Sequence, residues 1–113
     1  MLKLAESNNT QTKPHKKLLI FGGSPSRMKE VKLFLSQIKD IEIIGAFSEE
    51  EGVQIFKGTK DIDLVLIGGA YTSRQRLRIK ELVGNTKVTE PGVAYPYSNE
   101  NIFLHVKNSL LVS

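Results

Sequence analysis

The sequence predicts a three-layer α/β sandwich in which helices cover both faces of a mostly parallel sheet of four to five strands. Short apolar runs alternate along the chain with longer stretches whose apolar residues recur at helical spacing. Turn and capping residues separate these segments, and such an alternation of strand and helix is typical of a parallel sheet. Among the topologies that right-handed crossovers allow, we expect the strand order 2-1-3-4.

The first two strand–helix units have clear boundaries. Leu18–Phe21 is a continuous apolar run, as expected of a strand covered on both faces. Ser24 followed by Pro25 matches an N-cap before a proline at the first helical position. Ser48 and the glutamates after it have the spacing of a capping box. We therefore expect strands at 18–21 and 41–45 and helices at 25–38 and from 49 to about 58.

The second half of the chain contains two further units. Ile62–Ile67 is the third apolar run, and Thr72 or Ser73 can cap the helix that follows it. Pro91-Gly92 interrupts the next segment, so that only Val93–Tyr95 remains as a central strand. We therefore expect a strand at 62–67, a helix from 73 to about 83, a strand at 93–95 and, capped by Ser98, a helix from 99 to about 111.

Length and composition fit a single globular domain. The chain has 113 residues, of which 40% are hydrophobic and 25% are charged. Residues 1–16 are polar and poor in large apolar groups, so we expect a disordered tail there and the domain at 17–113. The absence of cysteine excludes disulfides, thiolate metal sites and thiol nucleophiles. Because no apolar run is long enough to cross a membrane, we expect a cytoplasmic protein with no membrane partner.

Two pairs of glycines follow two of the predicted strands. Gly22-Gly23 ends the first strand, and Gly68-Gly69 ends the third. In open α/β sheets, ligands and reactive groups gather at the carboxyl ends of the strands, where the strand order reverses. With the order 2-1-3-4 this point lies between the first and third strands. We therefore expect both pairs to meet at one cleft.

Four stretches carry, by their order and spacing, a resemblance to a known family. They are the first strand with its turn (18–27), the second strand with the start of its helix (41–52), the third strand (61–67) and the loop into the last helix (95–100). The sequence resembles the receiver domain of bacterial two-component response regulators, which implies a flavodoxin-like fold. The similarity spans about residues 17–83 and, less closely, 93–112. One of that family's five strand–helix units is missing between Gly84 and Val93.

The chemistry of receiver domains does not carry over to this chain. Receivers bind Mg²⁺ with an acidic pair at the positions of Gly22 and Gly23. Their phosphorylated aspartate corresponds to Gly68, and a lysine that acts with it corresponds to Tyr95. Magnesium needs oxygen ligands, and phosphoryl transfer needs an acceptor with charge stabilisation. Asp63 does not replace the acceptor, because it lies at the wrong end of its strand.

The resemblance therefore implies a pseudo-receiver that is not phosphorylated on aspartate. We expect a non-catalytic regulatory or adaptor module that binds a protein partner and has no catalytic residue, metal or cofactor. A homodimer is also expected, because a shortened sheet leaves an exposed edge near Val93–Tyr95. The two histidines, His15 in the tail and His105 in the last helix, have no neighbouring partner that would make either a general base.

An alternative function is the binding of a phosphate-containing ligand, a nucleotide or a flavin, at the cleft between the glycine pairs. A Gly-Gly-Ser turn before a helix offers backbone N–H groups and hydroxyls to an anion. The turn matches neither the P-loop nor the dinucleotide fingerprint, however, and turn geometry alone accounts for such glycines. The candidate anion-binding residues are Gly22, Gly23, Ser24, Ser26, Arg27, Gly69 and Arg74.

The charge pattern does not favour nucleic-acid binding. The formal net charge of +4 is common among soluble proteins. Arg74 and Arg78 share one side of their predicted helix, whereas Arg76 and Lys80 share another. No aromatic residues interleave with these cations to stack on bases. We therefore interpret the four side chains as a solvated helix surface.

Overall fold

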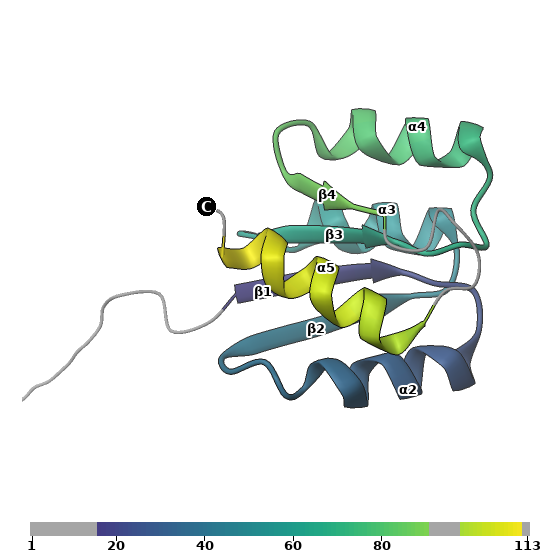
Figure 1. Cartoon of the computed structure of the whole chain (residues 1–113). Helices are drawn as coiled ribbons and strands as arrows, with labels where there is room; N and C mark the ends of the chain where they lie inside the picture. The colour runs from purple at the N-terminus through teal and green to yellow at the C-terminus, as the bar shows by residue number, and fades with distance from the viewer. Residues whose placement is uncertain (1–15, 91–97, 112–113) are drawn as a thin grey trace, which may run out of the picture.

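A computed structural model describes residues 16–90 and 98–111 of the chain. These residues form the predicted α/β fold, in which strands and helices alternate (Figure 1). Residues 1–15, which make up nearly all of the predicted tail, lie outside the described part, and Lys16 already belongs to the first strand. The elements are β1 (Lys16–Phe21), α2 (Pro25–Leu35), β2 (Ile41–Ala46), α3 (Glu49–Gly58), β3 (Leu64–Ile67), α4 (Ser73–Val83), β4 (Lys87–Thr89) and α5 (Asn99–Leu111).

The described sheet has four parallel strands in the predicted order β2-β1-β3-β4. β1 lies inside the sheet and pairs with β2 on one side and β3 on the other. Phe21, the last residue of β1, is in register with Ala46 of β2 and Ile67 of β3. The carboxyl ends of these three strands therefore lie level, and the turns after β1 and β3 leave the sheet beside each other.

Helices cover both faces of the sheet, α2 and α5 on one face and α3 and α4 on the other (Figure 1). Because side chains alternate along a strand, Leu18 and Ile20 of β1 pack in the α2–α5 layer. Leu19 and Phe21 pack in the α3–α4 layer. This double burial explains why β1 is apolar at four consecutive positions. Among the described residues, no helix is both long and apolar enough to span a membrane.

The predicted helix starts are confirmed by capping hydrogen bonds. The Ser24 hydroxyl accepts from the N–H of Arg27 (3.3 Å), and the Ser98 hydroxyl accepts from the N–H of Asn101 (3.1 Å). Ser48 likewise accepts from the third residue of α3 (3.0 Å). Thr72, and not Ser73, caps α4, where it forms a complete capping box with the side chain of Gln75. Each cap satisfies an N–H that the first helical turn leaves without a partner.

The fourth strand differs from the sequence-based expectation. It lies at Lys87–Thr89, directly after the turn at Gly84, and pairs in parallel with β3. Gly84 has φ of 59°, a left-handed conformation that lets the chain leave α4 abruptly and form the strand early. The segment Val93–Tyr95 and the sheet edge expected there lie outside the described residues. Among the described strands, β2 and β4 form the two edges.

Candidate functional site

The two Gly-Gly turns lie against each other at the carboxyl edge of the sheet. Gly22 donates its N–H to Ala46 (2.8 Å), and Gly68 donates its N–H to Phe21 (2.9 Å). Each bond continues the strand ladder by one step beyond the strands themselves. A Cβ added at Gly23 would lie 3.3 Å from the Cβ of Ala70. The turns after β1 and β3 are therefore in close contact, as the strand order implied.

A small cavity of about 40 Å³ lies at the two turns. It has room for about one water molecule, whereas sites for organic ligands measure about 300–1,000 Å³. Most of its wall is apolar, so it offers few hydrogen-bond partners to a polar guest. Its lining residues are Ile20, Phe21, Gly22, Gly23, Ser24, Arg27, Met28, Val31, Leu66, Gly68 and Ile102.

Met28 fills the space beside the first glycine turn. A Cβ added at Gly22 would lie 2.8 Å from its Cε, and one added at Gly45 would lie 2.8 Å from its Sδ. The Met28 side chain is almost fully buried, in the layer between the sheet and α2. The two glycines thus make room for a thioether. A side chain at position 22 would force the end of the Met28 side chain to shift, and a carboxylate there would also be placed next to apolar groups.

Tyr71, in the loop between β3 and α4, ties the two turns together. Its hydroxyl donates a 2.8 Å hydrogen bond to the carbonyl of Gly22, and its ring packs edge-on against Phe21 with centroids 6.1 Å apart. Burial, reinforced by the charges of Glu51 and Glu49, raises the pKa of the Tyr71 phenol. Tyr71 therefore stays protonated and keeps donating well above neutral pH.

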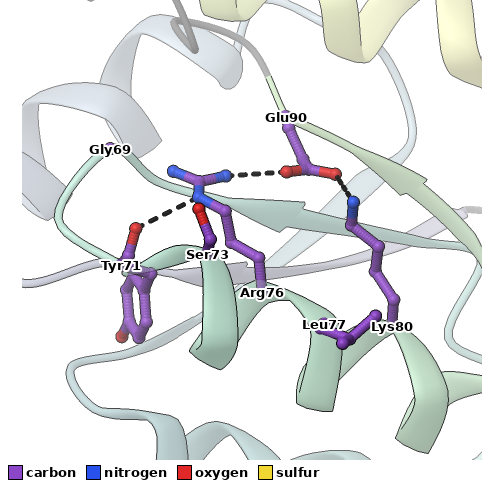
Figure 2. Close-up of a pocket in the computed structure, with 7 residues that line it drawn as sticks. All are labelled: Gly69, Tyr71, Ser73, Arg76, Leu77, Lys80 and Glu90. Atoms are coloured by element: carbon purple, nitrogen blue, oxygen red, sulfur yellow. Dashed lines mark hydrogen bonds and ion pairs between the residues drawn. The ribbon is translucent and has the colours of Figure 1, made fainter.

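Arg76 on α4 binds the second turn. Its Nη2 donates to the carbonyl of Gly68 (2.5 Å), and its Nε donates to the carbonyl of Tyr71 (3.1 Å). Its Nη1 pairs with Glu90 at 2.9 Å, and Lys80 pairs with the other oxygen of the same carboxylate at 2.5 Å (Figure 2). Burial alone would raise the pKa of Glu90, but hydrogen bonds from Lys80 and Arg76 outweigh it and hold that pKa below its usual value.

The interpretation of α4 as a solvated cationic surface is wrong for Arg76. Only 14% of its side chain is exposed. Residues 76, 79 and 83 are spaced to share one stripe of the helix, and Ile79 and Val83 of that stripe are buried against the sheet. Arg78 lies on an exposed face, where it forms a bidentate salt bridge with the carboxylate of Glu49 on α3 (2.7 Å for each hydrogen bond). Arg78 hydrogen-bonded to Glu49 lowers the pKa of that carboxyl.

The candidate anion-binding residues are only partly brought together. Four of them, Gly22, Gly23, Ser24 and Arg27, line the small cavity. The other three do not line it. Gly69 lines a different hollow on the α4 side, and Arg74 is exposed to solvent. The hydroxyl of Ser26 lies 3.2 Å from the hydroxyl of Ser24.

The donors that an anion would need at the start of α2 are largely engaged. The N–H of Arg27 already donates to Ser24, and Pro25 has no N–H to offer. The Arg27 guanidinium binds Glu30 (2.9 Å) and Asn99 of α5 (2.5 Å). This geometry does not favour a nucleotide or flavin at the glycine turns.

The remaining polar candidates lie apart from the turns. Asp63 accepts a 2.8 Å hydrogen bond from the N–H of Lys17, at the amino end of the sheet, as expected from its place before β3. His105 has its Nδ1 3.5 Å from the hydroxyl of Thr89. Tyr95 and His15 lie outside the described residues. Within residues 16–90 and 98–111, no group of three or more histidines, aspartates and glutamates could hold a metal ion.

Sequence reasoning missed Tyr71 and Arg76, the two residues that organise the site. Tyr71 carried no local signal, because its partner Gly22 is 49 residues away. Arg76 did carry one, since its spacing from Ile79 and Val83 places it on the buried stripe of α4. No known protein family matches the chain, and comparison with curated proteins gives no significant match. The resemblance to receiver domains therefore rests on the quoted stretches of sequence.

Proposed function

We propose that the chain is a pseudo-receiver, a non-catalytic regulatory or adaptor module that binds a protein partner and is not phosphorylated on aspartate. One observation carries the proposal, the packing of Met28 into the space beside Gly22. In the family that the sequence resembles, this turn holds the carboxylates that bind Mg²⁺. Here the apolar side chain of Met28 packs against the same turn.

The second turn supports the same proposal. Gly68 stands where a receiver has its phosphorylated aspartate, and its carbonyl is bound by the guanidinium of Arg76. Position 68 offers no acceptor oxygen on a side chain, and phosphoryl transfer needs one. The absence of clustered carboxylates also removes the mutual repulsion that such a cluster creates. Tyr71 and Arg76 bind the main chain of the two turns, which supports a site that works without a metal.

The cellular setting follows from the resemblance alone. In this proposal the module works in the bacterial cytoplasm, in or beside two-component signalling, and responds to the presence of its partner. The expected homodimer would use the sheet edge near Val93–Tyr95, which lies outside the described residues. Light scattering at high protein concentration tests the dimer, and a monomeric mass there contradicts it.

A binding experiment tests the adaptor role. The immobilised protein is used to capture partners from cells that encode it, and each captured protein is then purified. Its Kd for the chain is measured with and without acetyl phosphate and Mg²⁺. A receiver domain with an intact aspartate, treated in parallel, controls for the reagents. The proposal expects a purified partner whose Kd is the same under both conditions, whereas a Kd that depends on acetyl phosphate would contradict it.

A further inference from the structure

A hollow of about 600 Å³ opens between the β3–α4 loop, α4 and the end of β4 (Figure 2). It shares no lining residue with the small cavity at the glycine turns. Its volume lies within the range of about 300–1,000 Å³ that is usual for sites of small organic molecules. The residues that line it are Gly69, Tyr71, Ser73, Arg76, Leu77, Lys80 and Glu90.

The guanidinium of Arg76 is fixed in this hollow before any ligand arrives. Two of its nitrogens donate to the carbonyls of Tyr71 and Gly68, which sets the orientation of its plane. The third nitrogen, Nη1, is left to meet an anionic group, and at present it meets Glu90. A cation held in place in this way loses little side-chain entropy on binding an anion.

Lys80 completes a receptor for an anion with two oxygens. It lies four residues after Arg76 and therefore on the same side of α4. The two cations each contact a different oxygen of the Glu90 carboxylate, at 2.9 Å from Arg76 and 2.5 Å from Lys80. A carboxylate or a phosphate group of a ligand presents the same pair of oxygens.

Glu90 occupies this receptor as a tethered anion. It follows directly after the last residue of β4, so that its side chain can turn away without breaking the ladder between β3 and β4. With Glu90 turned away, Arg76 and Lys80 would face the hollow without a carboxylate. The hollow therefore has a charged end that is complementary to an anion.

The other walls of the hollow suit the apolar part of such a molecule. Leu77 is 57% exposed, although it comes from the middle of a packed helix. At Gly69, no atom lies within 4 Å of the place where a Cβ would stand, so that side of the hollow is open. The hydroxyl of Ser73 adds a hydrogen-bonding group beside the cations.

We propose that this hollow binds a small organic anion whose carboxylate or phosphate replaces Glu90 on Arg76 and Lys80, while its apolar part contacts Leu77. Glu90 acts as a built-in competitor, so that only anions that outcompete a tethered carboxylate are retained. The site is separate from the small cavity at the glycine turns, and this proposal does not depend on the proposed pseudo-receiver function.

Titrations followed by NMR test the site. The probes are inorganic phosphate and hexanoate, each compared with sodium chloride at equal ionic strength because surface cations also attract anions. The wild type and Glu90→Gln are titrated first. Glu90→Gln is expected to bind at least one probe about tenfold more tightly, which corresponds to about 1.4 kcal/mol. The preferred probe then identifies the head group as phosphate or carboxylate.

Two further variants locate the binding. Lys80→Gln added to Glu90→Gln is expected to abolish the gain in affinity. Arg74→Gln added to Glu90→Gln is the matched control, since Arg74 is an exposed cation of the same helix outside the hollow, and it is expected to leave the gain intact. Equal losses from both variants would show general charge attraction and would overturn the proposal.

The outcome is read at the amides of Gly69, Ser73 and Leu77. If folded Glu90→Gln shows no shift there with either probe, the proposal is wrong. Circular dichroism checks that each variant is folded, because Glu90→Gln removes two ion pairs. If Glu90→Gln is unfolded, Glu90→Asp replaces it, since the shorter side chain keeps the charge but withdraws the carboxylate. Glu90→Asp is again expected to bind at least one probe more tightly than the wild type does. An affinity equal to that of the wild type, or no binding of either probe, overturns the proposal.

Discussion

The hydroxyl of Tyr71 donates a 2.8 Å hydrogen bond to the carbonyl oxygen of Gly22 and thereby joins the loop after β3 to the turn after β1. Arg76 makes the matching contact with the carbonyl of Gly68. Both turns at the strand reversal are thus held through their main chains by side chains of one loop and one helix. This arrangement links both turns to the segment formed by the β3–α4 loop and α4.

Replacement of Tyr71 by phenylalanine is expected to lower the free energy of unfolding by about 1 kcal/mol, because it leaves the partly buried carbonyl of Gly22 without this donor. The ring and its edge-on contact with Phe21 remain, so that packing is preserved. Urea denaturation measures the change. An unchanged midpoint would show that this hydrogen bond does not contribute to the stability of the turn.

An aspartate at Gly22 is expected to destabilise the protein by about 1–2 kcal/mol, because the end of the Met28 side chain has to shift away from the new Cβ. In a Met28→Ala background no such shift is needed, and the cost of the same substitution falls by about 1 kcal/mol or more. A double-mutant cycle in urea measures this coupling. Strictly additive costs would contradict the role given to Met28.

Two glycines of α3 form a matched pair. A Cβ at Gly52 would overlap the ring of Phe21, whereas at Gly58 nothing lies within 4 Å. Gly52→Ala is therefore expected to cost about 2–3 kcal/mol, since a buried ring of β1 has to move. Gly58→Ala is expected to be neutral or to stabilise by about 0.5 kcal/mol through helix propensity. Thermal unfolding of both variants gives the comparison, and equal effects would contradict the packing of α3 on β1.

The ion pairs of Glu90 predict a pH dependence. Its pKa is lowered in the folded protein from the usual 4.5, so its charged form is the stabilised one. The stabilisation is complete above the unfolded pKa and is lost as the pH falls through the lower, folded pKa. The difference in unfolding free energy between wild type and Glu90→Gln should therefore be larger at neutral pH than below pH 4. A difference that is constant with pH would contradict the pairing. Arg78 also lowers the pKa of Glu49, but Glu49 is present in both proteins, so its contribution to the pH dependence cancels in the difference.

The fold could be predicted because its signals are local. The run Leu18–Phe21 is apolar at every position since both faces of β1 are covered. Ser24 and Ser48 each mark a helix start by bonding to an N–H three residues later. These patterns give the element order, and the crossover rule then leaves few strand orders to consider.

The organisation of the site could be predicted only in part. That the two glycine turns meet follows from strand order. The link between the two turns depends on the hydrogen bond from Tyr71 to Gly22, and these residues come together only in the folded chain. Leu77 is apolar but 57% exposed, while only 14% of the Arg76 side chain beside it is exposed. Hydrophobicity alone assigns these two residues the wrong way round, although the spacing of Arg76 from Ile79 and Val83 places it on the buried stripe. Hydrogen bonds to two carbonyls satisfy its guanidinium there.

We propose that the turn resembling a phosphorylation site does not carry that chemistry. The most direct test is the intact mass of the purified protein after incubation with acetyl phosphate and Mg²⁺, beside a receiver domain with an intact aspartate. The control is expected to gain one phosphoryl group, and this chain is expected to keep its mass. A stable gain of one phosphoryl group on this chain, mapped to an aspartate, would contradict the proposal.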